Sequence, residues 1–180
     1  MNNRILVAVD LQKDFIDGSL GTKEAEAIVE PAAARIEAAK AAGDLVIATM
    51  DTHQEDYLDT REGRFLPVVH CVENTPGWQL NPRIAKALEG CVVVAKPTFG
   101  STELPGLIEN VFEEIGDGKG FEIELIGLCT DICVVSNALI LKAAFPEAEL
   151  KVASGCCAGV TPGKHEAALE TMRSCQIVVE

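Results

Sequence analysis

Short apolar runs alternate with amphipathic, helix-like stretches along this chain. The apolar runs are nearly continuous, which is typical of strands buried on both faces of a parallel sheet. Between them, apolar residues recur at helical spacing, as in Ile28, Ala32, Ile36 and Ala39. The pattern therefore predicts an α/β fold in which helices cover both faces of a parallel sheet. The predicted strands cover residues 4–9, 45–50, 91–95, 121–128, 149–153 and 177–179.

Helical stretches are predicted between these strands. The first is one long helix that begins after Thr22, a favourable N-cap, and ends at Gly43. A long polar loop is expected over residues 51–78, and ordered loops of this length are usually functional. No linker or internal repeat divides the chain, so we expect a single domain over residues 1–180. The other predicted helices cover residues 82–88, 103–115 (broken near Pro105), 131–144 and 164–174.

Chemically useful residues stand at the carboxyl ends of four predicted strands. Asp10, Asp51 and Lys96 directly follow three apolar runs, and Cys133 comes shortly after a fourth. The carboxyl ends of parallel strands line one crevice, where ligands of such folds bind. An acid, a base and a thiol gathered there are the parts of a nucleophilic active site.

Cys133 is the candidate nucleophile of this site. Asp131 is expected to open a helix, which places Cys133 in the first turn, where free N–H groups and the helix dipole favour a thiolate and can stabilise an oxyanion. Lys96 would hold Asp10 ionised and favour the thiolate, while Asp10 would accept the thiol proton and return it to a leaving amine. A packed cysteine, a capping aspartate and a solvated lysine remain the alternatives.

The loop after the second strand contains candidate metal ligands. Asp51 and His53 stand at the strand end, His70 follows seventeen positions after His53, and Glu62 lies between the two histidines. Nitrogen and carboxylate ligands suit Zn, Mn or Fe. The alternative is two unrelated histidines on a polar loop. The third histidine, His165, lies in a helical stretch and is expected on the surface.

Charge and composition narrow the partners and the compartment. The net charge of −13 disfavours nucleic acid and anionic membrane surfaces. No apolar run approaches the ~20 residues that cross a bilayer, and the first strand begins at Arg4 without room for a signal region, so a cytoplasmic location is expected. Seven cysteines, an odd number, are expected to be reduced there. The spacing of Cys129 and Cys133 does not match a Cys-x-x-Cys redox pair.

Taken together, the motifs resemble the isochorismatase-like cysteine hydrolases, and within them the nicotinamidase-related amidases. This resemblance implies a three-layer α/β/α fold with a six-stranded parallel sheet. It also implies a catalytic triad of Asp10, Lys96 and Cys133, a cis peptide bond before Cys129, and an oxyanion hole formed by the N–H groups of Cys129 and Cys133. The matching segments lie in family order and are Val-Asp10-Leu-Gln-Lys-Asp-Phe15, Thr-Met-Asp51-Thr-His53, Leu-Pro-Val-Val-His70-Cys71, Val-Ala-Lys96-Pro and Gly127-Leu-Cys-Thr-Asp-Ile-Cys133-Val.

The same resemblance implies a divalent metal, in the first place zinc, held by Asp51, His53 and His70. The fourth ligand varies between relatives, and Glu62 is preferred here over Asp59. Nicotinamidases commonly carry an aromatic residue just ahead of the second metal histidine. Aliphatic residues precede that histidine in this chain. The expected aromatic contacts of the substrate pocket are therefore Phe15, Trp78 and Phe99.

The expected function is hydrolysis of a small amide, such as nicotinamide to nicotinate and ammonia, through a thioester on Cys133. Ureido or carbamoyl compounds are alternative substrates, with Arg61 or Arg64 as candidates to hold a carboxylate. Isochorismate is another alternative, although hydrolases of that type do not use a cysteine nucleophile. A thiol redox sensor or a binding protein on the same fold would be non-enzymatic. The resemblance also implies a homo-oligomer, a dimer or larger.

Overall fold

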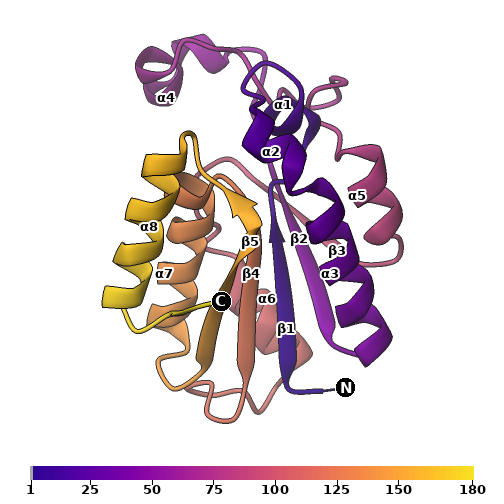
Figure 1. Cartoon of the computed structure of the whole chain (residues 1–180), viewed down its shortest axis with the longest axis vertical. Coiled ribbons are helices and arrows are strands. Elements are labelled where there is room, and N and C mark those ends of the chain that lie inside the picture. Colours follow the sequence, from indigo (N-terminus) through magenta and orange to yellow (C-terminus); the bar gives the residue numbers. More distant parts are fainter. Residues whose placement is uncertain (1) are drawn as a thin grey trace.

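Six apolar runs form one parallel sheet in the computed structural model, which describes residues 2–180 (Figure 1). The strand order across the sheet is β3-β2-β1-β4-β5-β6, and each neighbouring pair is parallel. The predicted α/β architecture with a six-stranded parallel sheet is therefore confirmed. The strands are β1 (Arg4–Val9), β2 (Leu45–Asp51), β3 (Val92–Lys96), β4 (Glu122–Leu128), β5 (Glu149–Ala158) and β6 (Val178–Val179).

Helices cover both faces of the sheet and divide its buried side chains into two cores. In β1, Ile5, Val7 and Val9 belong to one core, whereas Leu6 and Ala8 belong to the other. This division arises because successive side chains of a strand point to opposite faces, and it explains why the strands read as continuous apolar runs. The first core is completed by α6 (Leu104–Val111), α7 (Val135–Ala144) and α8 (Pro162–Ser174), and the second by α1 (Lys13–Ile16), α2 (Lys23–Ala27), α3 (Val29–Ala42) and α5 (Pro82–Ala87).

The prediction of one long first helix is wrong, because two helices, α2 and α3, meet at Ile28. The predicted ends are confirmed. The Thr22 hydroxyl accepts a hydrogen bond from the Ala25 N–H at 3.0 Å, and Gly43 ends α3 in the left-handed region with a φ of 79°. Pro31, in the first turn of α3, is the sign of this break that the sequence analysis overlooked, because proline has no N–H to donate to the carbonyl of Ala27 four residues earlier.

Two other elements differ from their predicted extents. Pro105 lies in the first turn of α6 and so begins this helix instead of breaking it. The fifth strand is longer than predicted. Ser154 and Gly155 interrupt its apolar run, but backbone pairing with β4 resumes near Cys157 after a shift in register.

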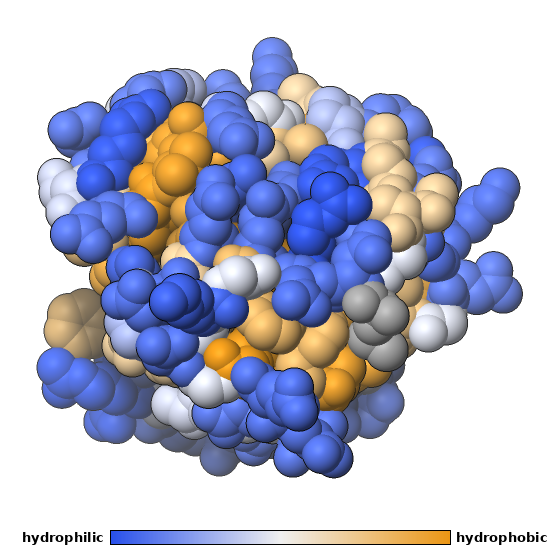
Figure 2. Space-filling model, turned by 90° about the horizontal axis from the view of Figure 1, so that it is seen from below, coloured by the Kyte–Doolittle hydropathy of each residue, from blue (hydrophilic) through white to orange (hydrophobic). Residues whose placement is uncertain are grey.

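The carboxyl ends of the strands lie at one end of the molecule, together with α1 and α2 (Figure 1). The loop of residues 51–78 folds over this end and contains a 3-10 turn, η1 (Tyr57–Asp59), and α4 (Arg61–Phe65). The opposite end of the molecule is mostly hydrophilic, with scattered apolar patches (Figure 2). Among the helices of residues 2–180, none combines the length and apolar character needed to span a bilayer.

Gly127 in β4 determines how closely the two central strands approach each other. Its φ is 118°, a conformation that side chains rarely adopt. A Cβ atom at this position would overlap the main-chain oxygen and nitrogen of Val9, the last residue of β1. Position 127 therefore requires glycine. The close approach also fixes the path of the chain into Asp10, which follows Val9.

We expect Gly127→Ala to lower the free energy of unfolding by about 3 kcal/mol or more, because the positive φ and the overlap are both unfavourable. Urea unfolding followed by circular dichroism measures this change. Gly106→Ala is the matched control, since a Cβ atom there, in the first turn of α6, would meet no atom within 4 Å. The control should be neutral or stabilising by up to about 1 kcal/mol. Equal stability of the two variants would contradict the argument.

Candidate active site

The structure brings Asp10, Lys96 and Cys133 together at the carboxyl edge of the sheet. The ammonium group of Lys96 lies 2.6 Å from Asp10 Oδ2 and 3.6 Å from Cys133 Sγ. All three side chains are buried. They come from the end of β1, the end of β3 and the turn that follows β4, so three segments distant in sequence meet at one point.

Asp10 is held in a fixed position by the neighbouring strand β2. Its backbone is in the left-handed region, with a φ of 47°. Its N–H donates to the carbonyl of Thr49 at 3.1 Å, and the Thr49 hydroxyl donates to Asp10 Oδ1 at 2.7 Å. These bonds orient the carboxylate so that Oδ2 faces Lys96.

A single π-helical turn, Thr130–Val134, carries Cys133 and leads into α7. The peptide bond Leu128–Cys129 that precedes the turn is cis, as the family resemblance implies. The buried amide of Asn137 donates to the carbonyl of Cys133 at 2.8 Å and fixes the turn. The expectation that His165 is a surface residue is wrong, because its ring is partly buried with Nδ1 2.8 Å from the hydroxyl of the first residue of the turn.

Asp51, His53, Glu62 and His70 gather beside these three residues. One ligand atom from each lies within 4.8 Å of all the others. Asp51 Oδ2 is 2.9 Å from Nε2 of His53 and 3.6 Å from Nε2 of His70. Glu62 Oε1 is 3.5 Å from Nε2 of His53. Asp59, the alternative to Glu62, lies in η1 and is not a member of this group.

These four side chains fit a divalent metal ion. Two imidazole nitrogens and two carboxylates are ligands that zinc, manganese and iron accept. His70 Nδ1 lies 2.8 Å from the carbonyl of Val68. Because a carbonyl only accepts hydrogen bonds, Nδ1 carries the proton and the lone pair of Nε2 faces the group. His53 Nε2 is buried and forms no well-aligned hydrogen bond among residues 2–180, although Asp51 Oδ2 lies 2.9 Å away, as expected of a nitrogen that shares a metal with this carboxylate.

Asp51 connects these four candidate ligands, called here the metal-ligand group, to Asp10, Lys96 and Cys133. Its Oδ1 lies 3.3 Å from the ammonium of Lys96, while Oδ2 faces the histidines. The fully buried Gln12 fixes the backbone of Asp51, since it accepts from the Asp51 N–H at 2.7 Å and donates to the Asp51 carbonyl at 2.8 Å. The sequence analysis included Gln12 only as part of a motif.

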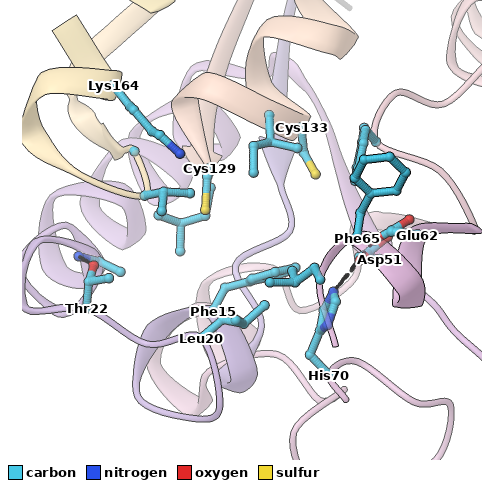
Figure 3. Close-up of a pocket in the computed structure, with 17 residues that line it drawn as sticks. Phe15, Leu20, Thr22, Asp51, Glu62, Phe65, His70, Cys129, Cys133 and Lys164 are labelled. Atoms are coloured by element: carbon cyan, nitrogen blue, oxygen red, sulfur yellow. Dashed lines mark hydrogen bonds and ion pairs between the residues drawn. The ribbon is translucent and has the colours of Figure 1, made fainter. Parts of the chain in front are cut away.

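A largely apolar cavity of about 330 Å³ lies over Cys133 and the metal-ligand group (Figure 3). Phe15 and Phe99 line it, as expected. The expectation for Trp78 is wrong, because its side chain packs against the second core and its Nε1 donates to the Thr52 hydroxyl at 2.9 Å, outside the cavity lining.

Sequence reasoning missed Phe65 and Lys164 in the cavity wall. Phe65 ends α4 and is largely exposed, and its ring stands beside the cavity in Figure 3. Phe65 lies only five residues before His70, but the sequence analysis considered only the residues directly before this histidine, which are aliphatic. Lys164 comes from α8, and no motif included it. Arg61 and Arg64, the candidates to hold a carboxylate, do not line the cavity.

Residues 4–180 match the family model described as the Isochorismatase domain. The chain belongs to the isochorismatase family. A nicotinamidase/pyrazinamidase from Mycobacterium tuberculosis (strain ATCC 25618 / H37Rv) is 27% identical to this isochorismatase-family chain over 181 residues, which cover 97% of this chain and 96% of the relative.

Solved structures of other amidases resemble this family member over nearly their whole length. The pyrazinamidase of Pyrococcus horikoshii in complex with zinc matches with a TM-score of 0.78 and 26% identity, over 99% of this chain and 98% of that one. The N-carbamoylsarcosine amidase from Thermoplasma acidophilum matches with a TM-score of 0.76 and 26% identity, over 100% of this chain and 96% of that one.

Burial of Cys133 in this isochorismatase-family site, more than the charges around it, favours a protonated thiol before reaction. Burial and the Asp10 carboxylate raise the pKa of Cys133 well above its usual value, by more than Lys96 lowers it. Lys96 lowers the pKa of Cys133 as expected, but burial and Asp10 have the larger effect, so the expected net preference for a thiolate is wrong. Burial also raises the pKa of the Asp10 carboxyl, which makes its ionised form a stronger base.

The opposite charges keep Lys96 and Asp51 ionised. Burial alone would lower the pKa of Lys96, but the carboxylate of Asp10 raises it above its usual range. Burial alone would raise the pKa of Asp51, but the neighbouring imidazoles of His53 and His70 and the charge of Lys96 lower it below its usual range.

We expect Asp10→Asn to accelerate alkylation of Cys133 by iodoacetamide at neutral pH. Removal of the carboxylate lowers the pKa of the thiol. Each unit of decrease raises the thiolate fraction about tenfold but makes the thiolate less nucleophilic, so the rate should rise about threefold per unit. Mass spectrometry of the Cys133 peptide, from about pH 6 to 10, measures the rate. In the wild type the rate should rise with pH across this range, because the pKa is raised. Asp59→Asn should behave as the wild type, whereas slower alkylation of Asp10→Asn would refute the assignment.

Proposed function

We propose that this chain is a cysteine-dependent amidohydrolase that acts on small amides, with Asp10, Lys96 and Cys133 as its catalytic triad. The proposal depends on one observation. At the base of an apolar cavity, the Lys96 ammonium lies 2.6 Å from the Asp10 carboxylate and 3.6 Å from the Cys133 sulfur. The relative and structures named as amidases support hydrolysis of a C–N bond in the same family.

In the first step, Cys133 Sγ attacks the carbonyl carbon of the amide. As the S–C bond forms, Asp10 takes the proton of the thiol, because its oxygen is the neighbouring base. The carbonyl oxygen gains negative charge, which the N–H groups of Cys129 and Cys133 would stabilise. Lys96 stays protonated and holds the carboxyl group of Asp10 in place.

The C–N bond then breaks, and Asp10 gives its proton to the leaving nitrogen, so that ammonia departs and a thioester remains on Cys133. Water attacks the thioester carbon and gives a proton to Asp10. The C–S bond breaks, the acid leaves, and Asp10 returns the proton to the sulfur. The sum of the steps is amide plus water to acid plus ammonia, and Asp10 carries one proton in each half.

We propose that Asp51, His53, Glu62 and His70 hold a divalent metal, with zinc as the first candidate because a pyrazinamidase of similar fold contains it. When bound, such an ion supplies Lewis-acid chemistry, which polarises an oxygen or nitrogen ligand or lowers the pKa of a bound water. Three of its proposed ligands, Asp51, Glu62 and His70, line the same cavity as Cys133, so the ion would lie beside the substrate.

Nicotinamide is the first candidate substrate, since a relative over nearly the whole chain is named a nicotinamidase/pyrazinamidase. The rings of Phe15, Phe65 and Phe99 give the cavity aromatic surface for a flat heterocycle. A carbamoyl compound is the second candidate, because a matching structure is an N-carbamoylsarcosine amidase.

In the other functions considered for this fold, Cys133 would not act as the nucleophile of a hydrolysis reaction. Isochorismate hydrolysis does not use a cysteine nucleophile, and a redox sensor or binding protein on this fold would release no ammonia. Assembly into a dimer or larger oligomer, a single domain over residues 1–180 and a cytoplasmic location stay predictions. A sizing column coupled to light scattering measures the assembly directly.

We expect Cys133→Ala to reduce ammonia release from nicotinamide by at least about a thousandfold, because the thioester cannot form. The variant should unfold at the urea concentration of the wild type, since alanine is small and favours helix. Cys175→Ala is the matched control, because Cys175 is a partly buried cysteine at the end of α8 and does not line the cavity. Comparable turnover by Cys133→Ala and Cys175→Ala would end the nucleophile proposal.

Glu62→Gln should weaken binding of zinc by about 100-fold, because an amide oxygen replaces a charged ligand. Titration of the metal-free protein with zinc and a chromophoric competitor measures the affinity. Asp59→Asn removes a nearby carboxylate that is outside the ligand group, so it should bind zinc as tightly as the wild type. The opposite ranking of these two variants would move the fourth ligand to Asp59.

A further inference from the structure

Among the described residues that line the cavity, Lys164 is the one lysine or arginine. The carboxylates that line the cavity, Asp51 and Glu62, both belong to the metal-ligand group. Lys164 is exposed, and within residues 2–180 its ammonium forms no ion pair, in contrast to those of Lys96 and Lys151. The proposed mechanism uses Lys96 and leaves Lys164 without a role.

The start of α8, which carries Lys164, is tied to the π-helical turn that carries the nucleophile. Nδ1 of His165 lies 2.8 Å from the hydroxyl oxygen of Thr130. The N–H of Val160 donates to the Asp131 carboxylate at 2.8 Å. These two contacts fix the position of the backbone around Lys164 relative to the turn that contains Cys133.

Lys164 and the metal-ligand group lie on different sides of the cavity. Figure 3 shows the Lys164 nitrogen pointing inward near Cys129, while Glu62 and His70 gather across the cavity. The Cys133 sulfur lies between the two sides. A substrate whose amide carbon is next to this sulfur can therefore extend its other end toward Lys164.

We propose that Lys164 is a specificity-determining residue, which raises kcat/KM for amides that carry a carboxylate at the end away from the scissile bond, relative to neutral amides of the same size. This inference rests on the proposed function of Cys133. A carboxylate at Lys164 would gain charge-assisted hydrogen bonds, whereas a neutral group would leave the ammonium in water and gain nothing. Because the chain has a net charge of −13, this cation is also the part of the cavity that can attract an anion.

Two amides of similar size, one negatively charged and one neutral, test this preference. Succinamate carries a carboxylate, and levulinamide replaces it with a neutral methyl ketone. We expect wild-type kcat/KM for ammonia release to be about tenfold higher with succinamate, as for one charge-assisted contact. This ratio should decrease at high salt. Lys164→Met should bring the ratio near one, and Lys164→Arg should keep it above one.

Lys119→Met is the matched control, since Lys119 is an exposed lysine in the turn before β4, outside the cavity lining. It should keep the wild-type ratio. A ratio that Lys164→Met leaves unchanged, or a wild-type preference for levulinamide, would overturn the proposal.

Binding separates this proposal from the proposed function. Calorimetric titration of Cys133→Ala with succinamate should give a dissociation constant about tenfold smaller than that of Cys133→Ala combined with Lys164→Met. Equal constants would overturn the role of Lys164. If the wild type released no ammonia from any amide while Lys164→Met still weakened binding, the proposed function would fail and the carboxylate site would stand.

Discussion

The rest of the site depends on the ion pairs that the buried ammonium of Lys96 forms with two carboxylates. The ammonium lies 2.6 Å from Asp10, 3.3 Å from Asp51 and 3.6 Å from the sulfur of Cys133, and it donates to the carbonyl of Thr98 at 3.0 Å. Removing a charge of this kind from water costs several kcal/mol, which only close partners of opposite charge offset. The cation therefore requires both carboxylates around it. This requirement brings the ends of β1, β2 and β3 to one point beside the turn after β4.

The residues at this point could be predicted because the ends of buried parallel strands follow from elementary rules. A continuous apolar run indicates a buried parallel strand, and the polar residue that ends it must lie at the common edge. Asp10, Asp51 and Lys96 satisfy this rule without any knowledge of packing. The protonation of Cys133 could not be predicted in the same way. The local argument from the helix start favoured a thiolate, but burial and a neighbouring carboxylate, which depend on the tertiary structure, have the larger effect on its pKa.

The cavity wall and the supporting residues were hidden for a different reason. Phe65 and Lys164 line the cavity only because α4 and the start of α8 fold over the sheet edge, and neither helix carries a motif. Gln12 and Asn137 are buried amides whose hydrogen bonds hold main-chain groups of the site. An amide that clamps a distant backbone has no signature in the local sequence, because its partner is specified by the fold alone.

Helix α4 combines two features in a single turn. Its residue Glu62 faces the two histidines, and Phe65, three positions later, stands against the cavity. Residues three apart on a helix are neighbours on the same face. Any rotation of this turn therefore displaces a candidate metal ligand and an aromatic wall together. A substitution that shifts this turn should therefore change the affinity for an ion and the shape of the cavity at the same time. Asp10 and Lys96, at the ends of strands, would keep their positions.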